Sequence, residues 1–117
     1  MNTTKLTDLS YLLKASDDTE FLIKMFVMFR TTVPEIKLLM DIALQKKKYE
    51  TIYELAHKLK SPISILGMKI TKNKIEKIES DTKNKVKYET YHGRIKDIFN
   101  DCQIAMEELL VYEKDLI

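Results

Sequence analysis

Apolar residues recur every three or four positions along most of this 117-residue chain, and that spacing predicts long amphipathic helices. The first long series predicts a helix over residues 19–46, and its inward members are Leu22, Met25, Phe26, Phe29, Val33, Ile36, Met40 and Ala43. Pro34 falls inside this series. Because the periodicity continues past it, we expect a kink there rather than an end. The last series predicts a helix that begins near residues 86–88, with inward positions at Tyr88, Tyr91, Ile95, Ile98, Cys102, Ala105, Leu109, Tyr112 and Leu116.

Two shorter periodic segments in the middle of the chain predict a helical hairpin. They cover residues 49–66 and 69–82, and Gly67 between them suits a left-handed helix end. The inward positions are Ile52, Leu55, Leu59, Ile63 and Leu66 in the first segment and Ile70, Ile75 and Ile78 in the second. Near the start of the chain, Thr7 or Asp8 is expected to cap a short helix that ends near Leu13 and turns Leu9, Leu12 and Leu13 inward.

These segments together predict an all-α protein. Short connections between long helices favour antiparallel neighbours, so we expect an antiparallel up-down four-helix bundle with a short extra N-terminal helix. Only two Gly and two Pro residues occur, which also favours a few long helices over a sheet. No repeat or low-complexity tract divides the chain, and residues 1–117 are expected to form a single domain.

The helix expected over residues 49–66 places a histidine on the side opposite its apolar stripe. At about 100° per residue, the apolar stripe is roughly 80° wide, and His57 lies roughly 140° from Ile52. Lys60, Ser61 and Ser64 share the face of His57. The pattern therefore predicts an exposed imidazole beside an ammonium group and two hydroxyl groups.

The same stretch reads His57-x-x-Lys60 and has Gly67 ten residues after the histidine. That string resembles the signature of histidine phosphotransfer (HPt) domains, the four-helix modules that relay phosphoryl groups in two-component signalling. The resemblance covers most of the chain. It departs from the family pattern at Ser61, where the family usually has glycine, and Pro62 follows.

The resemblance implies a phosphorelay intermediate that accepts a phosphoryl group on His57 from a receiver-domain aspartate and passes it to another receiver. The implied partners are response-regulator receiver domains and a hybrid histidine kinase. No cofactor or metal is implied on this chain, and magnesium is expected on the partner receiver domain. The alternative from another class is a non-catalytic helical docking module for a receiver or another signalling partner.

The chemistry of the residues agrees with a phosphoryl carrier. An exposed imidazole is a nucleophile near neutral pH, and Lys60 is one helical turn away, within reach of phosphoryl oxygens. Ser61 and Ser64 add hydroxyl donors. If the hairpin turns at Gly67, residues 76–79 lie opposite His57, and Glu79 is the better candidate for a carboxylate that holds one ring N–H. A solvated Glu79 paired with Lys83 is at least as well supported.

Several lysines surround the expected hairpin and predict a basic rim that steers an acidic partner. They are Lys58, Lys69, Lys72, Lys74 and Lys77. A solvated lysine-rich face explains any single one of them equally well.

Charge and composition exclude several other functions. With 20 basic and 18 acidic residues, the net charge of +2 lacks the basic excess of a nucleic-acid binder, which disfavours a nucleic-acid-binding bundle. Two histidines and one cysteine, far apart, form no credible zinc site, and no glycine-rich phosphate loop indicates a kinase with its own ATP site. Whether a phosphocarrier histidine makes this protein an enzyme stays open.

The remaining expectations concern Cys102, the cellular compartment and His92. Cys102 falls in an apolar seam and is expected to be a core residue, and one cysteine fits a reducing compartment. No apolar run is long enough to span a membrane or to resemble a secretion signal. We therefore expect a cytoplasmic monomer. His92, beside Gly93, is expected to be an ordinary surface residue because no lysine follows it at the required spacing.

Overall fold

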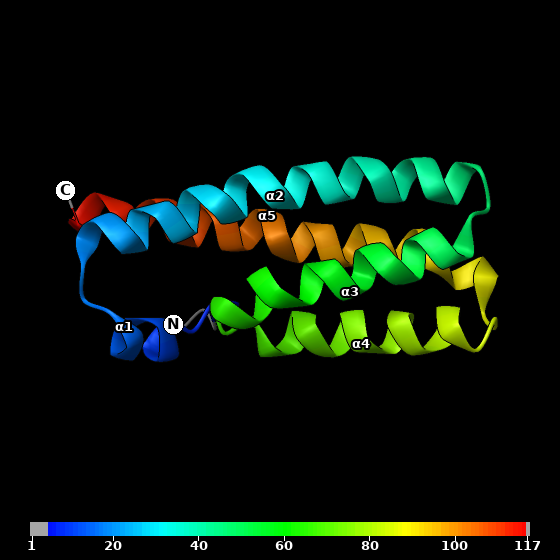
Figure 1. Cartoon of the computed structure of the whole chain (residues 1–117), viewed down its shortest axis with the longest axis horizontal. Coiled ribbons are helices and arrows are strands. Elements are labelled where there is room, and N and C mark those ends of the chain that lie inside the picture. Colours follow the sequence, from blue (N-terminus) through cyan, green and yellow to red (C-terminus); the bar gives the residue numbers. More distant parts are fainter. Residues whose placement is uncertain (1–4, 117) are drawn as a thin grey trace.

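A computed structural model describes residues 5–116, and every regular element in that range is a helix. The all-helical prediction is therefore confirmed for these residues (Figure 1). The elements are α1 (Ser10–Ala15), α2 (Thr19–Gln45), α3 (Tyr49–Ile65), α4 (Lys69–Lys83), a short 3-10 turn (Tyr88–Thr90) and α5 (Tyr91–Leu116). No helix within residues 5–116 is long and apolar enough to cross a membrane.

The long helices lie lengthwise against one another, and their connections alternate between the two ends of the molecule (Figure 1). α3 packs against α4 and α2, and α5 packs against α2 and α4. The apolar stripes meet in one buried core, whose largest fully buried side chains include Tyr91, Phe26 and Leu22. The series predicted for α2 is buried except for Met25, which is half-buried, and α2 continues through Pro34.

The ends of α2, α3 and α4 use one turn geometry, in which the residue after the helix cap has a positive φ. These residues are Lys47, Gly67 and Lys85. At the end of α3, the Gly67 N–H donates to the Ser64 carbonyl and the Met68 N–H donates to the Ile63 carbonyl. The predicted left-handed turn at Gly67 is therefore confirmed, with a φ of 64°.

The segment before α1 crosses the end of the α3–α4 hairpin. The Asp8 N–H donates to the Leu66 carbonyl at 2.9 Å, and a Cβ atom on Gly67 would lie 2.0 Å from the Asp8 carbonyl oxygen. Glu108 on α5 accepts hydrogen bonds from the N–H groups of Leu6 (2.9 Å) and Thr7 (3.0 Å). This N-terminal segment is thus tied to the turn that ends α3 and to α5.

The first helix differs from the prediction. Its N-cap is Leu9 and not Thr7 or Asp8, and the Asp8 carboxylate instead accepts hydrogen bonds from the N–H and hydroxyl of Ser10, the first helical residue. Leu12 is buried, but Leu13 is 37% exposed, so its inward placement was wrong.

α4 buries Ile75 and Ile78 as predicted, but its first turn differs from the prediction. Ile70, predicted to face inward, is 56% exposed, and Thr71 is buried in its place. The Thr71 hydroxyl donates to Asp101 Oδ2 at 2.9 Å, and Lys74 Nζ lies 2.8 Å from the same oxygen. Because this buried carboxylate on α5 binds polar groups, it turns a polar position of α4 toward the core.

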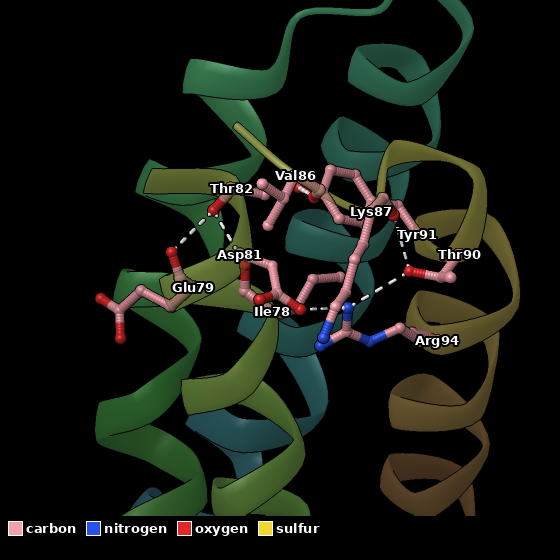
Figure 2. Close-up of polar contacts among 9 residues, drawn as sticks. All are labelled: Ile78, Glu79, Asp81, Thr82, Val86, Lys87, Thr90, Tyr91 and Arg94. Carbon is pink, nitrogen blue, oxygen red and sulfur yellow. Dashed lines mark hydrogen bonds and ion pairs between the residues drawn. The ribbon is translucent and has the colours of Figure 1, made fainter. Parts of the chain in front are cut away.

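The connection between α4 and α5 is a network of polar contacts (Figure 2). Arg94 donates to Asp81 and to the Thr90 hydroxyl, and the Tyr91 hydroxyl donates to the Val86 carbonyl. α5 begins at Tyr91, three residues after the latest predicted start, because Tyr88 belongs to the preceding 3-10 turn. There Tyr88 stacks on the ring of Tyr49 and stays 39% exposed rather than entering the core.

Candidate functional site

His57 lies at the centre of α3, and 64% of its side chain is exposed. Ile52, Leu59 and Ile63 are fully buried on the other side of this helix. The predicted exposure of the imidazole is confirmed. Because α3 is fixed by its buried side, the ring is presented from a rigid element and not from a loop.

Glu79 on α4 joins His57 to Lys60. Its Oε2 lies 2.7 Å from His57 Nδ1, and its Oε1 lies 3.0 Å from Lys60 Nζ. The antiparallel hairpin around Gly67 places Glu79 at the level of His57, as its register predicts. The carboxylate therefore pairs with two residues of α3, in place of the alternative pairing with Lys83.

Glu79 is ionised at neutral pH. Burial alone raises its pKa, but hydrogen bonds from His57 and Lys60 outweigh burial and hold the pKa below its ordinary value. The hydrogen bond to Glu79 in turn raises the pKa of Lys60. Because an ionised carboxylate can only accept, His57 Nδ1 carries the ring hydrogen. In the neutral imidazole, Nε2 then keeps its lone pair.

The backbone around Glu79 is also held in place. The Thr82 hydroxyl donates to the carbonyls of both Ile78 and Glu79 at 2.9 Å. Figure 2 shows the Glu79 carboxylate pointing away from the Asp81–Arg94 pair, so the two polar clusters occupy different sides of α4. Only 12% of the Glu79 side chain is exposed, which limits competition from water for the His57 hydrogen bond.

The other predicted site residues take no part in the hydrogen bonds and ion pairs that join this trio. Ser61, Ser64 and Lys58 are exposed on α3, and Gly67 forms the turn. Pro62 lies inside α3 and cannot donate to the Lys58 carbonyl, yet the helix continues to Ile65.

The basic rim is smaller than predicted. Lys74 binds Asp97 at 2.9 Å and Asp101 at 2.8 Å, so these carboxylates of α5 neutralise its charge. Lys58, Lys69 and Lys77 are exposed, and Lys72 is half-buried. The sequence analysis missed Asp101, the partner that holds Lys74, because a buried carboxylate within an apolar series carries no local signal.

Two further candidates are separate from the trio. His92 is exposed in the first turn of α5 and lines a groove between α2 and α5. Cys102 is buried, and burial raises the pKa of its thiol to about 12, so it is a core residue as predicted and not a reactive thiolate.

Within residues 5–116, no group of three or more His, Cys, Asp or Glu side chains is arranged to hold a metal ion. Comparison of the chain with family models, with curated proteins and with solved structures gives no significant match.

Proposed function

We propose that this protein is a histidine phosphotransfer protein and that His57 is its phosphoryl carrier. The observation that supports this best is the trio of His57, Glu79 and Lys60. It combines an exposed ring nitrogen, a carboxylate that holds the other ring nitrogen, and a cation one helical turn away. Phosphoryl transfer requires little more than in-line access, positioning and local positive charge.

In the proposed reaction, the lone pair of His57 Nε2 attacks the phosphorus of an aspartyl phosphate on a receiver domain. The N–P bond forms, the P–O bond to the aspartate breaks, and the electron pair stays on the leaving carboxylate. The phosphorylated ring is cationic because Nδ1 keeps its hydrogen, and the Glu79 carboxylate at 2.7 Å stabilises that charge. Transfer to a second receiver reverses these steps.

Lys60 supplies positive charge beside the transferring group. Its ammonium group is anchored on Glu79, the carboxylate that also holds the His57 ring, and 64% of the His57 side chain stays exposed. We assign it the stabilisation of charge that spreads over the phosphoryl oxygens. Ser61, Ser64 and Lys58 are exposed on the same helix and offer further donors.

The architecture proposed for this function is an antiparallel up-down four-helix bundle of α2 to α5, with α1 at one end. The alternating connections and the packing of α3 on α4 and α2 and of α5 on α2 and α4 support it. The proposed partners are response-regulator receiver domains, which bring the magnesium ion, and a hybrid histidine kinase. The proposed setting is the cytoplasm.

Transfer from a phosphorylated receiver domain tests the proposal. The protein is expected to become labelled, His57→Gln to stay unlabelled, and His92→Gln to behave as the parent protein. The label is expected to be lost in mild acid and to survive base, because protonation makes imidazole a good leaving group. Tight receiver binding without any label would instead support the docking module, and label on His57→Gln would place the carrier elsewhere.

A further inference from the structure

α2 carries a second apolar stripe on its solvent side, opposite the buried one. Met28 is 53% exposed and Leu38 is 61% exposed. Six of the large apolar side chains exposed in residues 5–116 belong to this one helix: Phe21, Val27, Met28, Leu38, Leu39 and Ile42. In Figure 1, α2 lies along one edge of the molecule, with α3, α4 and α5 all to one side of it. Exposed apolar side chains gathered on one face of a helix favour an interaction site.

The exposed side of α2 has the spacing of a coiled-coil seam. Seven exposed positions follow one another at intervals that alternate between three and four residues: Phe21, Lys24, Met28, Thr31, Glu35, Leu38 and Ile42. A regular 3-4 alternation lets a straight strip of one helix pack along another helix. The seam therefore fits a helical partner better than a flat or globular one.

The seam is complementary to itself when two copies of α2 run in opposite directions. If Lys24 faces Glu35 of a second copy, the same register places Phe21 against Leu38 and Met28 against Thr31. The two-fold symmetry repeats each contact. The dimer then has two Lys24–Glu35 ion pairs, two Phe21–Leu38 apolar pairs and, at its centre, two Met28–Thr31 contacts. A parallel arrangement instead places Lys24 on Lys24 and Glu35 on Glu35, which is repulsive.

Charges at the helix ends agree with the antiparallel arrangement. Asp17, Asp18 and Glu20 are exposed at the start of α2, and Lys46, Lys47 and Lys48 are exposed at its end. Antiparallel helices bring the acidic start of one copy toward the basic end of the other. The opposed helix dipoles favour the same orientation.

We propose that this face of α2 binds a second copy of the chain and forms a two-fold antiparallel dimer, in place of the monomer expected from the sequence. In the register that pairs Lys24 with Glu35, residues 19–40 overlap their own copies over ~33 Å at about 1.5 Å per residue. A strip one helix wide is at the low end of specific interfaces, so the dissociation constant is expected to be on the order of tens to hundreds of micromolar. His57 and Glu79 lie on α3 and α4, so the dimer is independent of the proposed phosphoryl transfer.

Sedimentation equilibrium of the whole protein at rising concentration tests the dimer. The average mass is expected to rise from that of one 13.8 kDa chain toward that of two. Lys24→Glu and Glu35→Lys each replace two attractions by two repulsions and are expected to weaken self-association by about tenfold or more. The double variant restores both pairs with reversed signs and is expected to recover it. Lys96→Glu, an exposed change of the same kind on α5, is the matched control.

All these positions are exposed, so every variant is expected to fold. Circular dichroism checks this. A parent protein that stays monomeric at millimolar concentration overturns the proposal, as does a double variant no better than the single ones. If Leu38→Asn weakens receiver binding and leaves self-association unchanged, the seam serves the receiver, and a second copy is the wrong occupant.

Discussion

Among single residues, Glu79 contacts both other members of the trio. One of its oxygens orients the His57 ring, and the other anchors Lys60. The sequence can place Glu79 near His57 because residues about ten positions to either side of the Gly67–Met68 turn face each other in a helical hairpin. It cannot establish that one carboxylate serves both partners, because that depends on how deeply the side chain is buried.

Glu79→Gln tests the orienting role. Glutamine keeps the shape of the side chain but removes the charge that stabilises a phosphorylated, cationic ring. Phosphoryl transfer from a receiver is expected to slow by about ten- to a hundredfold. Glu76→Gln removes the same charge one turn earlier on α4, where the side chain is exposed, and is expected to transfer at nearly the parental rate. Equal rates for both variants would show that Glu79 only joins two helices.

Lys60→Ala separates charge stabilisation from docking. The ammonium group matters most when charge spreads over the transferring oxygens, so the transfer rate is expected to fall by ~10- to 100-fold while receiver affinity changes little. Single-turnover rates and equilibrium binding measured on the same variant give both quantities. Lys96→Ala on α5 is the control. An unchanged transfer rate would show that Lys60 contributes only surface charge.

Among the elements, the positions of the long helices follow from local sequence, but some details at their ends do not. The apolar spacing predicts where the long helices lie, since burial of each stripe dominates their stability. It misplaces Ile70 and the start of α5, because the buried Asp101 and the stacking of Tyr88 on Tyr49 are contacts between distant segments. Local periodicity contains no information about such partners.

Replacement by alanine is expected to have opposite effects on stability at the two glycines. Gly67 has a φ of 64° and a Cβ would meet the Asp8 carbonyl oxygen, so Gly67→Ala is expected to destabilise by about 2 kcal/mol or more. Gly93 lies in α5 with nothing within 4 Å of a Cβ, so Gly93→Ala is expected to stabilise by about 0.5–1 kcal/mol. Urea unfolding measures both, and the same sign for the two variants would contradict this account of the α3–α4 turn.

The N-terminal segment makes the stability of the folded protein depend on pH. Burial alone raises the pKa of Glu108, but hydrogen bonds from Thr7 and Leu6 outweigh burial and hold it below the ordinary value. The stability from these bonds is therefore present above the unfolded pKa of about 4.3 and is lost as pH falls through the lower, folded pKa.

Glu108→Gln is therefore expected to cost about 1 kcal/mol at neutral pH. This difference from the parent protein should shrink as the pH falls below about 4, because the parent carboxyl then becomes neutral too. Unfolding free energies measured across that range test this. A difference that stays constant down to the acid limit would show that the charge of Glu108 contributes nothing.

For the whole molecule, the proposed bundle presents two separate faces. The α3–α4 face holds His57, Glu79 and Lys60, and the outer face of α2 holds the exposed seam. The fold class and His57 were predictable because they follow from spacing along one helix at a time. The seam was missed because the core-facing stripe of α2 accounts for its periodicity, and only burial shows which apolar residues are left over.

The position of the phosphoryl group on the imidazole ring tests the central claim most directly. Protein with ¹⁵N-labelled histidines is phosphorylated by a receiver domain, and its ring nitrogens are then observed by NMR. Because Glu79 holds Nδ1, the phosphoryl group is expected on Nε2 of His57, with the Nδ1 hydrogen still bonded to Glu79. Phosphorylation at Nδ1, at His92 or at a serine, or none at all, would contradict the assignment.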